Sequence, residues 1–206
     1  MLYMSKINVI KEEEMKSIEK GVRNCRKCSL WETRTNPVVG EGSLDPKVMF
    51  IGEAPGYNED KEGRPFVGKA GKVLDELLES IGLKREEIYI TNVLKCRPPN
   101  NRDPKSEEIK ACTPYLDRQI SIVKPSVICT LGNFATSYIL EKFGIKPENI
   151  GKLHGKVYRV KNLMIDASII PLYHPAAAVY NPEMKAILME DFRKIKSVLN
   201  KNSGNV

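Results

Sequence analysis

Short apolar runs alternate with amphipathic stretches over most of the chain. The apolar runs have the length of buried strands and cover residues 48–51, 88–94, 127–131 and 169–172. Helical spacing predicts helices over 134–143 and 182–199, one that ends at Gly82, one N-capped by Ser106, and one that ends around residues 21–24. The short strands 157–160 and 164–165 are expected to pair as a hairpin. This alternation predicts an α/β fold with helices on both faces of a parallel sheet.

Length and composition favour one folded domain. The 206 residues contain no linker and no repeat, and 41% apolar with 29% charged residues exclude disorder, collagen and coiled coil as descriptions of the whole chain. We therefore expect a single domain over 1–206. Within it, 1–24 form an N-terminal helix that leads into the first cysteines, and 200–206 form a flexible tail.

The charge balance favours a polyanionic partner. Thirty-three Lys and Arg against 26 Asp and Glu leave a net charge of +7, which suits nucleic acid. The sequence shows no signal peptide and no stretch of membrane-spanning composition. We expect a monomeric, cytoplasmic protein without membrane contact, whose cysteines are reduced.

The five cysteines fall into two groups. Cys25 and Cys28 are close enough in sequence to share one ion or cluster, and Cys96 and Cys112 offer two more thiols. The spacing C-x2-C-x67-C-x15-C fits neither a zinc ribbon nor a ferredoxin run, so by itself it leaves a metal site and inert cysteines both open. Cys129 lies inside an apolar run and is expected to be a small core residue.

Polar residues of distinctive character follow three of the predicted strands. Glu53 follows the first strand, Asn92 lies toward the end of the second, and His174 follows the fourth, while Phe66 belongs to the first loop. Because parallel strands bring their carboxyl ends to one edge, these side chains are expected to surround one crevice. A carboxylate, an amide, an imidazole and an aromatic ring suit a small, planar, polar ligand.

Five motifs together resemble the family 4 uracil-DNA glycosylases, the iron-sulfur branch of the uracil-DNA glycosylase superfamily. They are Gly52-Glu53-Ala54-Pro55-Gly56, Gly63-Arg64-Pro65-Phe66-Val67-Gly68, Thr91-Asn92-Val93, His174-Pro175-Ala176 and the four spaced cysteines. The resemblance implies a three-layer α/β/α sandwich with a central four-stranded parallel sheet. It also implies a 4Fe-4S cluster on Cys25, Cys28, Cys96 and Cys112. The implied activity is base excision repair, in which uracil is flipped out of single- or double-stranded DNA and hydrolysed from its sugar, leaving an abasic site.

The resemblance also implies roles for individual residues. Phe66 would stack on the flipped uracil, Asn92 would bind its edge, and His174 would donate to uracil O2. A further set would complete the pocket, with Glu53, Ala54 and Pro55 as its floor and Glu59 crowding C5 of the base. Glu53, Asn92 and His174 are the implied catalytic residues. In the better known branch an aspartate precedes the motif proline. Ala54 stands there instead, so stabilisation of the leaving uracil is expected to dominate.

Several residues are candidates for holding the DNA. Lys69, Arg97 and Arg102 are expected near phosphates, and the loop with Val179 and Tyr180 is expected to wedge into the gap left by the flipped base. His154 is expected to be a loop residue without an assigned role.

Two other classes of protein remain as alternatives. One is a non-catalytic nucleic-acid-binding module whose four cysteines hold structural zinc. The other is an iron-sulfur electron carrier, in which the polar rim of Glu53, Asn92 and His174 would serve no purpose.

Overall fold

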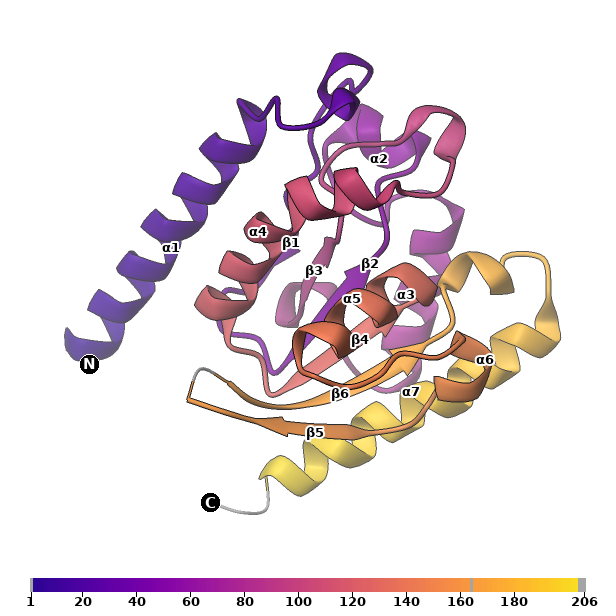
Figure 1. The fold of residues 1–206 in the computed structure, drawn as a ribbon. Helices are drawn as coiled ribbons and strands as arrows, with labels where there is room; N and C mark the ends of the chain where they lie inside the picture. Colours follow the sequence, from indigo (N-terminus) through magenta and orange to yellow (C-terminus); the bar gives the residue numbers. More distant parts are fainter. Residues whose placement is uncertain (1, 164, 204–206) are drawn as a thin grey trace.

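The computed structural model describes residues 2–163 and 165–203 (Figure 1). The helices are α1 (Leu2–Arg23), α2 (Tyr57–Glu62), α3 (Lys69–Ser80), α4 (Ser106–Val123), α5 (Asn133–Lys142), α6 (Ile150–Leu153) and α7 (Pro182–Ser203). Single 3-10 turns are η1 (Ser29–Glu32), η2 (Arg85–Glu87), η3 (Pro99–Asn101) and η4 (Pro175–Ala178). The strands are β1 (Glu41–Gly42), β2 (Val48–Gly52), β3 (Tyr89–Asn92), β4 (Val127–Leu131), β5 (Tyr158–Lys161) and β6 (Asp166–Leu172).

The strands form one sheet in the order β1-β3-β2-β4-β6-β5. The four central strands are parallel, which confirms the expected four-stranded core, and β1 and β5 add antiparallel edges that make the sheet six-stranded. Gly52 pairs with Asn92 in the register of β2 and β3. The ends of these two strands therefore lie side by side at the carboxyl edge of the sheet.

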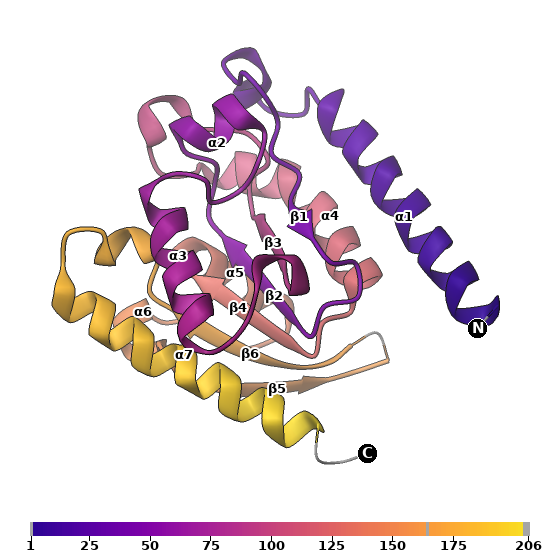
Figure 2. The same ribbon diagram turned by 180° about the vertical axis from the view of Figure 1, so that it is seen from behind.

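Alternate side chains of β2 face opposite helical layers. Phe50 packs with the apolar face of α3 and α7, whereas Ile51 packs with that of α4 and α5. Figure 2 shows α3 and α7 in front of the sheet, and Figure 1 shows α4 and α5 over the opposite face, with α1 outside α4. Ile18 and Val22 of α1 pack on Ile122 of α4. The expected three-layer α/β/α architecture is confirmed.

The hairpin near residue 162 differs from the prediction. β5 pairs with β6 itself, beginning at Lys161 and Asp166, rather than with a separate strand at 164–165. Asn162 closes the turn, since its N–H donates to Ile165 O (2.9 Å) and its Oδ1 accepts from Ile165 N (3.0 Å). Met164 lies outside the described residues. The fourth main strand thus starts at Asp166 instead of residue 169.

Three helical features also differ. Ser106 is the first residue of α4 rather than its N-cap, because Lys105 adopts the extended cap conformation and its N–H donates to Glu108 Oε2 (2.8 Å). α7 continues to Ser203, so the segment after residue 199 is helical at least that far, and residues 204–206 lie outside the description. α2 occupies part of the expected long loop. None of the described helices is long and apolar enough to cross a membrane.

Cys129 is a core residue, as the sequence predicts. Its side chain is fully buried in β4, in the same apolar cluster as Phe50 and Leu172. Burial raises the pKa of its thiol well above the ordinary value, so the thiol stays protonated and unreactive.

Candidate functional site

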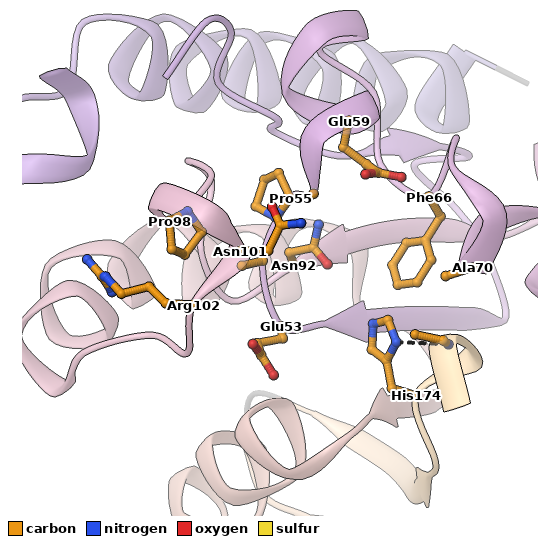
Figure 3. A pocket seen from close by; sticks show the side chains of 13 residues that line it. Glu53, Pro55, Glu59, Phe66, Ala70, Asn92, Pro98, Asn101, Arg102 and His174 are labelled. Atoms are coloured by element: carbon orange, nitrogen blue, oxygen red, sulfur yellow. Dashed lines mark hydrogen bonds between the residues drawn. The ribbon is translucent and has the colours of Figure 1, made fainter. Parts of the chain in front are cut away.

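A cavity of about 370 Å³ opens at the carboxyl edge of the central strands (Figure 3). Its walls come from the segments that follow β2, β3 and β6 and from the start of α3. The lining residues are Glu53, Ala54, Pro55, Gly56, Glu59, Phe66, Ala70, Asn92, Pro98, Asn101, Arg102, His174 and Ala176. The structure thus brings together every residue that the sequence places around the base: Glu53, Ala54, Pro55, Glu59, Phe66, Asn92 and His174.

Asn92 contributes an unsatisfied amide to this cavity. Its side chain is 2% exposed, and its Oδ1 is buried without a hydrogen-bond partner among the described residues. A Cβ on Gly52 would lie 2.3 Å from this oxygen and 2.7 Å from Phe66 Cζ, so glycine is required for both side chains to approach the end of β2. An unpaired buried acceptor costs about 1–3 kcal/mol. A ligand that donates a hydrogen bond to Asn92 removes this cost.

His174 presents one defined nitrogen to the cavity. Its Nδ1 accepts from Ala176 N (3.1 Å), which assigns the ring proton of the neutral form to Nε2. Burial lowers the pKa of His174 to about 4, and the nearby Glu59 carboxylate opposes this shift. The imidazole is therefore neutral at physiological pH, with an N–H donor and no charge.

Phe66 packs beside His174 on a constrained loop. The two rings have centroids 5.6 Å apart and an interplanar angle of 26°. Phe66 has φ +51°, an uncommon conformation for an aromatic residue, and Glu59 Oε1 holds the loop by accepting from Val67 N (2.9 Å) and Gly68 N (2.8 Å). Glu59 thus lines the cavity and also fixes the stacking residue. Sequence reasoning assigned it only a contact to the base.

Glu53 is another titratable group of the cavity. Burial, together with the nearby Asp103 carboxylate, raises the pKa of its carboxyl to about 7. Neutral and ionised forms are therefore comparably populated at neutral pH. Figure 3 shows the carboxyl group on the side of the cavity away from Glu59 and Phe66.

Asn101 is a polar lining residue that sequence reasoning missed. It lies in η3 with φ +54°, and its Oδ1 accepts from Arg97 Nε (2.7 Å). Asn100 also has positive φ (+55°). Asparagine tolerates this conformation better than most residues. The Asn100-Asn101 pair after two prolines was therefore an available signal for a tight, inward-turning loop.

The four expected cysteine ligands meet at a second, smaller cavity beyond the loop after β3. Cys25, Cys28, Cys96 and Cys112 all line it. Arg34 Nη1 donates to Cys96 Sγ (3.1 Å) and Lys95 N donates to Cys112 Sγ (3.2 Å). Burial raises the pKa of the Cys96 thiol, and that of Cys112 to about 12. No three described His, Cys, Asp or Glu side chains converge closely enough to hold a single metal ion.

Two pairings of cationic with aromatic side chains include residues that are adjacent in sequence to the cavity lining. Lys69 Nζ lies 5.0 Å from the centroid of the Tyr180 ring and also donates to the Tyr180 hydroxyl. Arg97 and Lys61 lie 5.1 and 4.9 Å from the ring of Tyr57, which is 52% exposed. Ala70 and Pro98, which follow Lys69 and Arg97, lie on opposite sides of the cavity in Figure 3. Tyr57 and Lys61 were not singled out from the sequence.

The other residues expected to contact DNA differ in how accessible their side chains are. Arg102 lines the cavity, but its guanidinium is held by both oxygens of the buried Glu108 (2.9 and 2.6 Å). Val179 is half-buried and packs against the core, while Tyr180 is 81% exposed. Tyr180 is therefore more accessible to DNA than Val179.

His154 is more than a loop residue. Its Nδ1 lies 2.7 Å from Oδ2 of the buried Asp191 in α7, and its ring lies 4.7 Å from that of Tyr173. Tyr173 directly precedes His174. His154 therefore supports the segment from which His174 enters the cavity.

Comparisons with known proteins identify the superfamily to which this chain is similar. The model of the uracil DNA glycosylase superfamily matches residues 39–199. A type-4 uracil-DNA glycosylase of Sulfurisphaera tokodaii is 53% identical over 90% of this chain and 85% of its own length. Type-4 enzymes of Saccharolobus solfataricus and Thermotoga maritima are 55% and 44% identical, over 86% and 93% of this chain and 83% and 97% of their own lengths. The chain belongs to the uracil-DNA glycosylase superfamily.

Proposed function

We propose that this protein removes uracil from DNA by hydrolysing the bond between the base and its sugar. The observation that carries the proposal is the unpaired buried amide oxygen of Asn92, in one cavity with a neutral His174 and the ring of Phe66. The similarity to type-4 uracil-DNA glycosylases supports it. Free uracil and an abasic site are the products.

Asn92 reads the edge of the base. Uracil presents an N3–H donor beside the O4 acceptor, so Asn92 Oδ1 accepts from N3–H while its NH2 group donates to O4. Cytosine presents the reverse pattern and would leave like groups facing each other in a dry pocket. Such buried mismatches cost about 1–3 kcal/mol each, which is enough to select uracil.

His174 stabilises the departing base. When the bond between C1′ and N1 breaks, its electron pair moves into the uracil ring and charge develops on O2. The Nε2–H of His174 donates to that oxygen, and the burial of the imidazole strengthens the interaction. Phe66 stacks on the base and keeps it aligned with two donors, the His174 Nε2–H and the Asn92 NH2 group.

Glu53 is the acceptor that we assign to the attacking water. Water adds to C1′ on the face opposite the departing base and loses a proton. The ionised form of Glu53 can orient this water and accept that proton, whereas Ala54 has no group to do so. Asn101 lines the same cavity and offers a further polar contact to the water or the sugar.

The DNA strand is held on both sides of the cavity. The base must leave the stack to reach His174, so the flanking phosphates need fixed cations. Lys69 with Tyr180 provides one such site. Arg97 and Lys61 around Tyr57 provide the other. Tyr180 is exposed enough to enter the gap left by the flipped base.

The four cysteines suit a 4Fe-4S cluster. They line one cavity, and Arg34 and a main-chain N–H donate to two of the sulphurs, which stabilises anionic thiolates. The group would supply a structural cross-link between the segment after α1, the loop after β3 and α4. Structural zinc in a non-catalytic module is the alternative. Action on single- or double-stranded DNA, the monomeric state and the cytoplasmic location stay predictions.

Replacing His174 tests the activity and its leaving-group donor together. Wild-type protein should release uracil from a uracil-containing oligonucleotide, and His174→Ala should slow the single-turnover rate by roughly 10² to 10³, the cost of losing one preorganised donor. DNA affinity should change little. Lack of uracil release by the wild type would refute the activity, and equal losses of rate and affinity would make His174 a DNA-positioning residue.

The pH dependence tests Glu53. Because its pKa is raised to about 7, the neutral acid predominates below pH 7 and cannot accept a proton from water. The single-turnover rate should rise through about pH 7 and then level off. Glu53→Gln should be slower and independent of pH across this range. A rise that persists in Glu53→Gln would assign it to another group.

Metal analysis tests the cluster. Anaerobically purified protein should be yellow-brown and contain about four irons per chain, because thiolate-bound clusters absorb through sulphur-to-iron charge transfer. Cys25→Ala should lose iron and thermal stability, and the buried Cys129→Ser is the matched control that keeps its iron. Colourless, active protein with one zinc per chain would contradict the assignment.

Salt dependence tests the cations around Tyr57. Each lost phosphate contact should reduce the slope of log affinity against log salt by about 1, so Lys61→Gln and Arg97→Gln should each bind DNA with a shallower slope. Lys161→Gln in β5 removes the same charge away from the cavity and should keep the wild-type slope. Equal slopes for all three variants would exclude this surface as a DNA contact.

A further inference from the structure

Lys95 is a buried lysine between the base cavity and the cysteine site. It is 1% exposed and lies in the turn after β3, three residues beyond Asn92 and next to Cys96. Its Nζ donates to Thr91 Oγ1 (2.6 Å), Asn92 O (2.7 Å) and Gln119 Oε1 (2.7 Å). No step of the proposed reaction uses this group.

The surrounding hydrogen bonds fix all three acceptors. The Thr91 hydroxyl donates to Val39 O (2.8 Å), so its oxygen is left to accept. The NH2 group of Gln119 donates to Val39 O (2.9 Å) and Tyr89 Oη (3.0 Å), so its Oε1 also faces Lys95 as an acceptor. With Asn92 O, three acceptors match the three hydrogens of an ammonium group. An apolar side chain of the same length would leave all three unpaired.

These contacts bear directly on the direction of the Asn92 amide. The peptide group that follows Asn92 is held at one end by Val93 N, which donates to Gly52 O (2.9 Å), and at the other by Lys95 Nζ, which binds Asn92 O. These two bonds hold the main chain from which the Asn92 side chain extends, and Asn92 Oδ1 has no partner of its own among the described residues.

The same residue connects to the cysteine site. The Lys95 N–H donates to Cys112 Sγ (3.2 Å), and its carbonyl accepts from Val38 N (2.7 Å). The short segment from Asn92 to Cys96 therefore ends on the base-reading amide at one side and on a cysteine ligand at the other.

We propose that Lys95 is a positioning residue that holds the Asn92 amide in its base-reading orientation, and so makes uracil recognition depend on the turn that carries Cys96. The proposal rests on the proposed function. Burying an ammonium group is costly, and here three hydrogen bonds offset that cost, one of them to the carbonyl of Asn92 itself. A role in orientation accounts for the lysine at this position.

A double-mutant cycle between Lys95→Met and Asn92→Ala tests the proposal. Single-turnover uracil release should fall roughly 10- to 100-fold in Lys95→Met, the range for misplacing a reacting group by about 1 Å. In the Asn92→Ala background the same change should have little further effect, because two residues that act through one group are not additive. Lys95→Met should also release cytosine at a measurable rate relative to uracil. Its iron content should equal that of the wild type.

Thr136→Val is the matched control for a merely structural role. The hydroxyls of Thr130 and Thr136 form a buried pair (2.8 Å) in the core between β4 and α5, away from Asn92. This variant should lose thermal stability but keep its rate and base selectivity. If Lys95→Met does not fold, Thr91→Val removes one acceptor while keeping the shape of β3, and should show the same loss of selectivity.

Three outcomes would overturn the proposal. One is a folded Lys95→Met with the wild-type rate and selectivity. Another is an equal fall in rate with Asn92 present and absent, which would make Lys95 a structural residue. The third is an effect that Thr136→Val reproduces. A wild-type protein that releases no uracil would instead refute the proposed function, before any variant is compared.

Discussion

The rest of the site depends on one unsatisfied acceptor, the buried Oδ1 of Asn92. An oxygen in this position is costly until a donor arrives, so the surrounding structure has to keep it from turning toward the backbone or toward water. Gly52 provides the space, because any side chain there would collide with the oxygen. Parallel pairing of β2 and β3 sets both residues at the same level of the sheet edge. The free-energy cost of burying this unpaired oxygen is offset when a base that donates a hydrogen bond to it binds.

The gathering of the site residues could be predicted from sequence because it follows from the topology. Parallel strands must bring their carboxyl ends to one edge, and Glu53, Asn92 and His174 each follow a different apolar run. Neither fact needs any knowledge of side-chain contacts. The same reasoning placed Cys129 in the core, since it lies within an uninterrupted apolar run.

What could not be predicted depends on contacts between segments far apart in the chain or on unusual backbone conformations. The left-handed φ of Phe66 is stabilised by Glu59, seven residues earlier, through two main-chain N–H groups whose direction no periodicity reveals. Gln119 meets Lys95 only because α4 packs across β3. The sequence predicted a separate strand at 164–165 as the partner of β5, whereas β5 pairs with β6. That prediction was wrong because the turn closed by Asn162 sets the register of the hairpin.

Burial is the main cause of the pKa shifts of Glu53 and His174 in the cavity. Burial lowers the pKa of His174 to about 4 and raises that of Glu53 to about 7, so both are driven toward their uncharged forms. In the proposed reaction, the buried surroundings of the neutral His174 strengthen its hydrogen bond to the negative charge that develops on departing uracil. The burial of Glu53 weakens it as a base, because it keeps part of this group protonated at neutral pH. With Ala54 in place of an aspartate, the proposed mechanism therefore relies less on activation of water and more on stabilisation of the leaving group, which is the larger requirement when the sugar reacts as a cation-like species.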